Sequence, residues 1–202
     1  KLGQTPLPDD LLHMRDLVPE DEYRYQTIYA KNEGAVVAPT AGFHFSREVI
    51  KKMEIKGIDT CFITLHSGLG NFRAIEVEDL TKHKMDSEQM IINEDNARMI
   101  NNAKAAGRKV CTVGTSSMKA VETAAIIDNR VKVFNGWTNK FIFPPYEFAI
   151  SDAMITNFHP PLSSMLMQVA AFGGYELIMN AYKYAIEKKY KFFTYGDAML
   201  II

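Results

Sequence analysis

Three histidines carry most of the proton-transfer chemistry that this sequence offers. His44 follows a Pro-Thr-Ala-Gly-Phe run, His66 stands before a glycine-rich loop, and His159 precedes two prolines. An imidazole gains or loses a proton near neutral pH, so each is a candidate general acid or base. A single histidine of this kind is equally well explained as a buried side chain satisfied by a backbone carbonyl. Three histidines beside glycine or proline favour one shared polar pocket.

The loops around these histidines have the composition of ligand-binding loops. Gly42, two residues before His44, lets the backbone approach a ligand closely. Gly68 and Gly70 follow a predicted strand, and the carboxyl end of a parallel strand is where α/β folds bind ligands. This loop lacks the third glycine of a dinucleotide-binding fingerprint. It is therefore a general ligand-binding candidate, and His66 adds a proton-transfer group to it.

Two further segments leave a predicted strand and enter a predicted helix. The segment 114–117 reads Gly-Thr-Ser-Ser, and its free N–H groups and three hydroxyls suit a carboxylate or a phosphate. An N-cap with nothing bound explains the same spacing equally well. No Gly-Lys-Ser/Thr sequence occurs, which excludes a P-loop. In the segment 156–164, Asn157 and His159 are free to face a ligand.

Composition narrows the function classes. The chain has 202 residues and a formal charge of −1, which excludes a polybasic nucleic-acid binder but allows a local basic groove. Its two cysteines lie in apolar runs without zinc-ligand spacing, so we expect a reducing compartment and no metal site. No apolar run reaches the roughly 18 residues of a membrane span. These features predict a cytoplasmic protein, and a first residue other than Met suggests a piece of a longer chain.

The elements that must position these loops alternate along the chain. Residues 1–18 are predicted to be a connector, and residues 19–202 one α/β domain. Apolar and β-branched runs predict strands at 59–65, 87–92, 109–113, 131–134, 148–156 and 198–202. Capping residues, prolines and glycines predict helices at 19–29, 46–53, 94–106, 116–127, 163–172 and 175–189. This order predicts a mainly parallel sheet, or a barrel-like α/β domain, covered by helices.

Taken together, five motifs in this order resemble those of one enzyme family, the S-adenosylmethionine:tRNA ribosyltransferase-isomerases of the queuosine pathway. They occupy residues 38–45, 64–72, 114–117, 155–159 and 192–199. The resemblance implies transfer of the ribosyl unit of S-adenosylmethionine to 7-aminomethyl-7-deazaguanine in the anticodon region of tRNA. Isomerisation of that unit gives epoxyqueuosine and releases adenine and methionine. S-adenosylmethionine is then a substrate, and no cofactor is implied.

The resemblance also assigns roles to residues. His44, His66 and His159 become the acid and base candidates, and Glu88 could orient a histidine or the amine. Residues implied to bind substrate are Pro39, Thr40, Gly42, Phe45, Gly68, Gly70, Phe72, Gly114, Thr115, Ser116, Ser117, Asn157, Tyr195 and Asp197. Family members carry an amino-terminal strand and a β-barrel domain that would precede Lys1. We expect a monomer that binds tRNA without contacting a membrane.

Several positions depart from the family pattern. Residues 9–11 differ after the Pro-Leu-Pro sequence, Asp86 stands where a histidine is common, and substitutions fall at Ser67, Leu69, Asn71, Pro161 and Ser163. A paralogue with another acceptor is therefore one alternative, and a methyltransferase acting on a small molecule is another. A third alternative is a non-catalytic tRNA-binding subunit. If tRNA binds, basic residues should gather at the mouth of the histidine pocket, and we expect Lys82, Lys84, Lys119 and Lys140 there.

Overall fold

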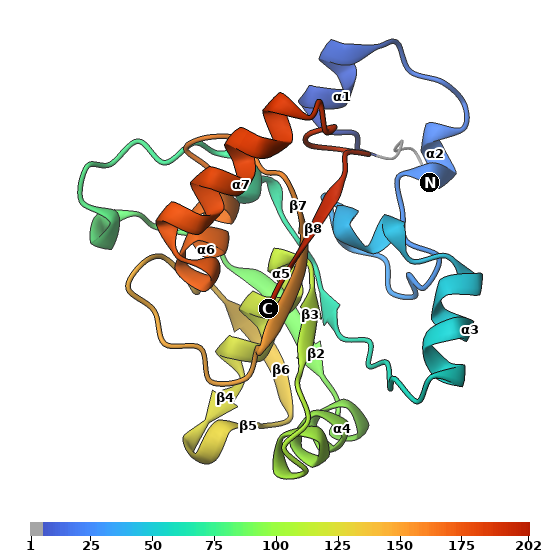
Figure 1. The fold of residues 1–202 in the computed structure, drawn as a ribbon, viewed down its shortest axis with the longest axis vertical. Helices are drawn as coiled ribbons and strands as arrows, with labels where there is room; N and C mark the ends of the chain where they lie inside the picture. The colour runs from blue at the N-terminus through green and yellow to red at the C-terminus, as the bar shows by residue number, and fades with distance from the viewer. Residues whose placement is uncertain (1–5) are drawn as a thin grey trace.

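Small sheets, rather than one large one, organise the chain. The computed structural model describes residues 6–202, shown in Figure 1. One sheet has the order β1–β2–β6, a second the order β3–β7–β8, and β4 pairs with β5 as a hairpin. The strands are β1 Thr64–Leu65, β2 Glu88–Ile92, β3 Cys111–Val113, β4 Ala125–Ile126, β5 Arg130–Val131, β6 Phe134–Thr138, β7 Ala153–Asn157 and β8 Ala198–Ile201.

The fold is mixed α/β, but the prediction of a mainly parallel sheet is wrong. Of the pairings in the described part of the chain, β3–β7 is parallel and the other four are antiparallel. The prediction assumed that each helix carries the chain across to a neighbouring parallel strand. Instead, α5 leads into the β4–β5 hairpin, and β6 then returns antiparallel to β2. The described strands form separate sheets, and no closed barrel is seen among them.

Helices surround these sheets. They are α1 Asp9–Met14, α2 Asp21–Arg24, α3 Arg47–Ile55, α4 Glu94–Ala105, α5 Thr115–Thr123, α6 Ser164–Gly173 and α7 Tyr175–Glu187. Short 3₁₀ turns are η1 Thr40–His44, η2 Leu69–Phe72, η3 Leu80–Lys82 and η4 Ile127–Asn129. In the described part of the chain, none of the helices is both long and apolar enough to cross a membrane.

Local capping chemistry explains where the longer helices begin. The hydroxyl of Ser46 accepts the N–H of Val49 at the start of α3, and Ser163 caps α6 in the same way. The side chain of Asn93 accepts the N–H of Asn96 at the start of α4. These three predicted helix starts are confirmed.

The predictions for the amino-terminal part of the chain are only partly confirmed. The helix predicted at 19–29 ends at Arg24, because Tyr25 leaves helical geometry and buries its ring against Phe43. The connector predicted at 1–18 includes α1, and its first five residues lie outside the described part. Of the strand predicted at 59–65, only β1 forms.

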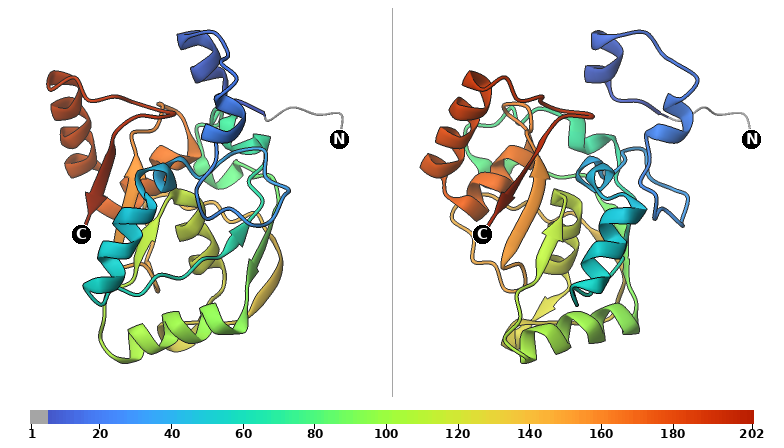
Figure 2. Two further views of the ribbon diagram at one scale, coloured as in Figure 1. Left: turned by 90° about the vertical axis from the view of Figure 1, so that its right-hand side faces the viewer. Right: turned by 45° about the vertical axis from the view of Figure 1, so that its right-hand side comes forward.

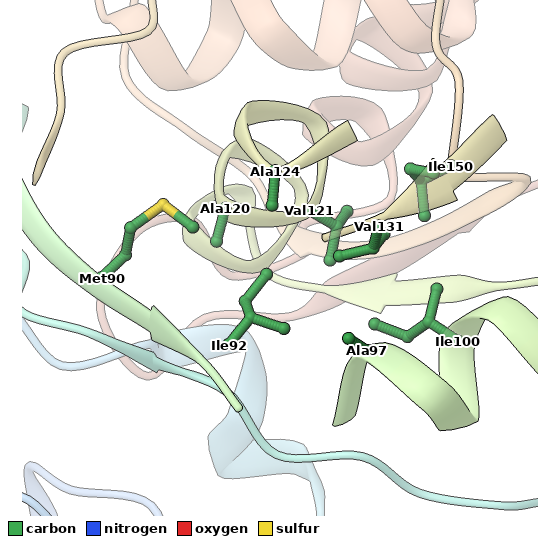
Figure 3. Packing of buried hydrophobic residues seen from close by; sticks show 9 residues of the cluster. All are labelled: Met90, Ile92, Ala97, Ile100, Ala120, Val121, Ala124, Val131 and Ile150. Atoms are coloured by element: carbon green, nitrogen blue, oxygen red, sulfur yellow. The ribbon is translucent and has the colours of Figure 1, made fainter. Parts of the chain in front are cut away.

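Two hydrophobic cores share one helix. The first joins β2, α4, α5 and β5, and Figure 3 shows Met90, Ile92 and Ile100 packed toward Ala120 and Val121 of α5. The second joins α5 to β7, β8, α6 and α7, with Met118 of α5 among its members. Figure 2 shows α6 and α7 together on one side of the molecule. Helix α5 is therefore held from two sides, which fixes the position of its amino terminus.

A buried carboxylate holds the segment that enters β7. Both oxygens of Glu122, on α5, accept backbone N–H groups, from Ala149, Ile150 and Ser151, each at 3.0 Å. Glu122 itself is buried. This bonding explains why the strand predicted to begin at 148 begins at Ala153, because the backbone donors before it are already used.

We expect Glu122→Ala to lower the free energy of unfolding by about 3 kcal/mol or more, since it leaves two buried N–H groups and the part-buried N–H of Ala149 without an acceptor. Urea unfolding monitored by circular dichroism measures the loss. The matched control is Glu147→Ala at an exposed position of the same segment, which should change stability by about 0.5 kcal/mol or less. Equal, small losses in both variants would contradict this role for Glu122.

Candidate functional site

A cavity of about 300 Å³ lies where the only parallel pair among the described strands ends. Parallel strands present their carboxyl ends at one edge of a sheet, so the segments after β3 and β7 meet there. The cavity is at the small end of the volume range for ligand pockets. Its lining comes from five segments of the chain, at residues 37–41, 67–74, 114–116, 156–165 and 193–194, together with Tyr25.

Asn157 ties three of these segments together. At the last position of β7, it is fully buried, and its side-chain oxygen accepts the hydroxyl of Thr40 at 3.0 Å. Its amide nitrogen donates to the carbonyls of Gly196 and Asp197 at 3.2 and 3.4 Å. One buried amide therefore fixes the loop of η1 and the loop before β8 against the end of β7.

His159 is the histidine that lines this cavity. It is buried, and its Nε2 lies 2.7 Å from the hydroxyl oxygen of Thr156. Its backbone N–H donates to the hydroxyl of Tyr182 at 2.7 Å. Burial lowers the pKa of His159 to about 4, because desolvation penalises the charged imidazolium. The side chain is consequently neutral at physiological pH and able to accept a proton.

The lowered pKa of His159 predicts an acid-sensitive stability. Between about pH 6.5 and 4 the unfolded chain binds a proton at this residue and the folded chain does not, so stability falls as the pH falls through this window. The loss from pH 7 to 5 should be about 2 kcal/mol. Urea unfolding at both pH values measures it, with His159→Gln as the control that lacks the titrating group. An equal pH dependence in the two proteins would contradict the assignment.

A buried ion pair supports the neighbouring wall. The side chain of Glu88, on β2, accepts the amide of Asn71 at 2.7 Å, the N–H of Gly68 at 3.0 Å and the hydroxyl of Ser67 at 3.2 Å. Its other oxygen accepts the ammonium of Lys119, on α5, and both charged groups are buried. We expected Glu88 to orient a histidine or the amine. Among the described residues it holds the loop after β1 against α5, while Ser67 and Asn71 line the cavity, and its expected role stays a prediction.

The structure brings half of the predicted site residues either to the cavity lining or to the residues that support its wall. Those on the cavity are Pro39, Thr40, Gly114, Thr115, Ser116, Asn157 and His159. The predicted anion-binding segment therefore opens into this cavity at the start of α5, although Ser117 does not line it. Their roles in binding and catalysis stay predictions.

The other two histidines are not part of this cavity lining. His44 is exposed at the end of η1. His66 is half-buried, and its ring lies against Gly34, where a Cβ would overlap it. The expectation of one pocket shared by three histidines does not hold in this structure. Both histidines lie in loops that reach the cavity through other residues, Thr40 and Ser67, so which side chains face it is decided within each loop.

Glycines of the first two motifs serve packing rather than the cavity surface. A side chain at Gly42 would overlap the hydroxyl of Tyr29, and one at Gly70 would overlap Asp86. Gly68 contributes through its N–H bond to Glu88. None of these three glycines lines the cavity, and their expected role in substrate binding stays a prediction.

Three further predicted residues, Phe45, Tyr195 and Asp197, also lie off the cavity lining. The ring of Tyr195 stacks on Phe43 with centroids 5.5 Å apart, and Asp197 accepts the N–H of Lys191 at 2.7 Å. Phe45 is half-buried at the end of η1. The side chain of Phe72 lies outside the described part of the structure. Tyr195 and Asp197 thus shape the loop whose Phe193 and Thr194 reach the cavity.

Several lining residues were not predicted. Thr156 is buried beside His159, and its position at the end of a buried strand was the available signal. Ser67 and Asn71 were noted only as departures from the family pattern, yet both face the cavity and bond to Glu88. Phe193 also lines it and belongs to the motif at 192–199, whereas Arg73 lines it without any distinguishing local sequence.

The expected cluster of lysines at the cavity mouth is not found as such. Lys119 is buried and paired with Glu88, and Lys82 is exposed and paired with Asp79. Lys140 is half-buried beside Tyr146, and Lys84 is exposed. As to metals, no three His, Cys, Asp or Glu side chains within residues 6–202 gather in a way that could hold an ion.

The sequence of the chain matches a known protein family. The profile of the family described as Queuosine biosynthesis protein matches residues 1–201, and the chain belongs to this family. Relatives named S-adenosylmethionine:tRNA ribosyltransferase-isomerase are 61% identical in Phocaeicola vulgatus and 62% identical in Parabacteroides distasonis. Each alignment covers all of this chain but 57% of the relative, so the chain spans little more than half of their length.

A solved structure agrees with these relatives. The crystal structure of an S-adenosylmethionine tRNA ribosyltransferase from Thermotoga maritima matches with a TM-score of 0.67 and 36% sequence identity. The match covers 81% of this chain and 52% of that one. The mixed α/β arrangement described above is therefore shared with a member of this enzyme class.

Proposed function

We propose that this protein transfers the ribosyl unit of S-adenosylmethionine to 7-aminomethyl-7-deazaguanine in tRNA and isomerises it, giving epoxyqueuosine, adenine and methionine. The observation that carries the proposal is the meeting of separate motif segments on one cavity, held together by Asn157. Relatives that bear the corresponding enzyme name are about 60% identical over the whole chain, which supports the same assignment.

The proposed reaction requires a base close to the sulfonium sulfur of S-adenosylmethionine. The positive sulfur of S-adenosylmethionine acidifies the adjacent ribose carbon, so a nearby neutral imidazole can remove a proton there. His159 suits this step best among the described histidines, because it lines the cavity and its lowered pKa keeps it neutral. Thr156, hydrogen-bonded to Nε2 of His159, would fix which ring nitrogen carries the proton.

The proposal also covers the substrates, the surroundings of the protein and its domains. S-adenosylmethionine acts as a substrate that is consumed, and no separate cofactor takes part. The acceptor is the modified base in the anticodon region of tRNA, and the protein works as a monomer in the cytoplasm without contacting a membrane. Residues 19–202 form the catalytic domain, with 1–18 as a connector.

Adenine release from S-adenosylmethionine tests the proposal. The protein at its natural length is incubated with S-adenosylmethionine, with and without tRNA carrying 7-aminomethyl-7-deazaguanine, and adenine is quantified by chromatography. Adenine that appears only with this tRNA supports ribosyl transfer. A methylated product would instead indicate a methyltransferase. Binding of tRNA that is unaffected by removing His44, His66 and His159, without adenine release, would indicate a non-catalytic subunit.

A further inference from the structure

A small recess adjoins the cavity between α5, α6 and the segment at 140–142. Its volume is about 10 Å³, and it shares Asn71, Thr115, Ser116 and Met165 with the cavity lining. This is close to the space that one water molecule occupies. The recess therefore admits a single oxygen atom from a ligand whose remaining atoms lie in the cavity.

The charges around this recess favour an anion. Both Lys119 and Lys140 line it, and no Asp or Glu does. The charge of Lys119 is offset by Glu88. The ammonium of Lys140 donates to the hydroxyl of Tyr146 at 3.1 Å and lies 5.4 Å from the centre of its ring, and it forms no ion pair within the described residues. Lys140 is consequently the cation that remains to be neutralised.

The other polar groups of the recess fit the same ligand. Ser164 and Gln168, at the start and middle of α6, are both more than nine-tenths buried there. The amide nitrogen of Gln168 donates to the carbonyl of Thr115, which fixes α6 against the start of α5. The recess thus combines buried polar groups with a half-buried cation and no acidic side chain, which favours a polar or anionic ligand atom there.

We propose that this recess, with Lys140 as its cation, receives one oxygen of the carboxylate in the methionyl portion of S-adenosylmethionine. The inference rests on the proposed function, because it assigns the orientation of that substrate in the cavity. The volume of the recess favours a carboxylate oxygen over an entire phosphate group. The reacting ribose would then lie in the wider cavity that His159 lines.

Decarboxylated S-adenosylmethionine provides the direct test. Equilibrium binding of both compounds, without tRNA, is measured by calorimetry for the natural protein and for Lys140→Met, Lys140→Arg and Lys132→Met. A charge-assisted hydrogen bond predicts that the natural protein prefers the carboxylated compound by roughly 10- to 100-fold. Lys140→Met should reduce this preference to about 3-fold or less, and Lys140→Arg should restore part of it.

The control variant Lys132→Met removes a lysine that also lies over an aromatic ring, Phe134, but is exposed and lines neither space. It should keep the full preference. Thermal unfolding shows whether each variant is folded before binding is compared.

Each remaining outcome is decisive. A natural protein that binds both compounds equally overturns the carboxylate assignment, even where tRNA-dependent adenine release upholds the proposed function. If Lys140→Met keeps the preference but weakens tRNA binding and lowers its salt dependence, the recess contacts a tRNA phosphate and the assignment is overturned. A folded natural protein that does not bind S-adenosylmethionine overturns both the inference and the proposed function.

Discussion

Replacing His159 with Asn is expected to slow adenine release by about 10²- to 10⁴-fold, the usual contribution of a positioned general base. Binding of S-adenosylmethionine should change by about 3-fold or less, because the substitution removes a proton acceptor and not the cavity walls. Single-turnover experiments with modified tRNA separate the two quantities. The same substitution at His44 or His66 is the comparison, and a variant of His159 with an unchanged rate would move the role to one of them.

The pH profile distinguishes a catalytic from a purely structural histidine. With a pKa of about 4 for His159, kcat/KM should stay level on the acidic side until about pH 5 and fall below it. Thr156→Val removes the hydroxyl beside Nε2 of His159 and should shift the pH at which kcat/KM begins to fall. Thr112→Val is the matched control, since its buried hydroxyl bonds to the carbonyl of Ala153, on the same sheet but off the cavity. If the pH profile is the same in Thr156→Val and in the natural protein, the positioning role of Thr156 is contradicted.

Breaking the buried pair of Glu88 and Lys119 should produce the largest loss of stability. Either Glu88→Gln or Lys119→Met leaves one charged or polar group buried without its partner, and we expect the free energy of unfolding to fall by about 3–5 kcal/mol. The double variant should recover a substantial part of that loss, because neither charge remains. Urea unfolding of the four proteins gives the coupling directly.

An exposed ion pair supplies the control for this cycle. Asp59→Asn removes the partner of Arg108 at the surface, 2.9 Å away, and should cost about 1 kcal/mol or less. The buried pair also holds Ser67 and Asn71 at the cavity, so the single variants should weaken binding of S-adenosylmethionine. If the stability losses of the two single variants simply add in the double variant, a direct interaction between Glu88 and Lys119 is contradicted.

The helices were largely predictable because their signals are local. Asn93 followed by two acids marks the start of α4, and Gly107 after its end adopts a positive φ of 67° that a glycine tolerates. The helix predicted at 116–127 forms from Thr115 but stops at Thr123, where the β4–β5 hairpin begins. The local signal for its turn is Asp128-Asn129, which adopt positive φ of 68° and 54°, and the helix prediction ran up to these residues without using it.

The sheets were not predictable in the same way, because strand direction depends on partners far along the chain. The run at 87–92 forms β2 as predicted, yet both of its neighbours are antiparallel. The run at 59–63 stays outside any sheet despite its β-branched composition. Apolar residues such as Ile63 meet the first core from a loop, which satisfies their burial without a ladder of hydrogen bonds.

The candidate site was predictable as a set of segments but not as a geometry. All five motifs reach the cavity, because each is a loop at the end of an element. The second motif reaches the cavity through Ser67 and Asn71, neither of which is among the predicted site residues. The residues that follow this motif, Arg73 and Ala74, also line the cavity. Whether a histidine in such a motif faces the cavity depends on the local course of its loop, because Thr40 and Ser67 line the cavity while His44 and His66 do not.

The bonds of Asn157 also bear on how the molecule folds. They close chain segments of 117 and 39 residues, and closing a longer segment costs more conformational entropy than forming a helical turn. Elements stabilised by local contacts, such as α4, can form before that closure, whereas the cavity cannot exist without it. The ability to bind a ligand should therefore arise in the last step of folding, so that partly folded chains carry helices but no working site.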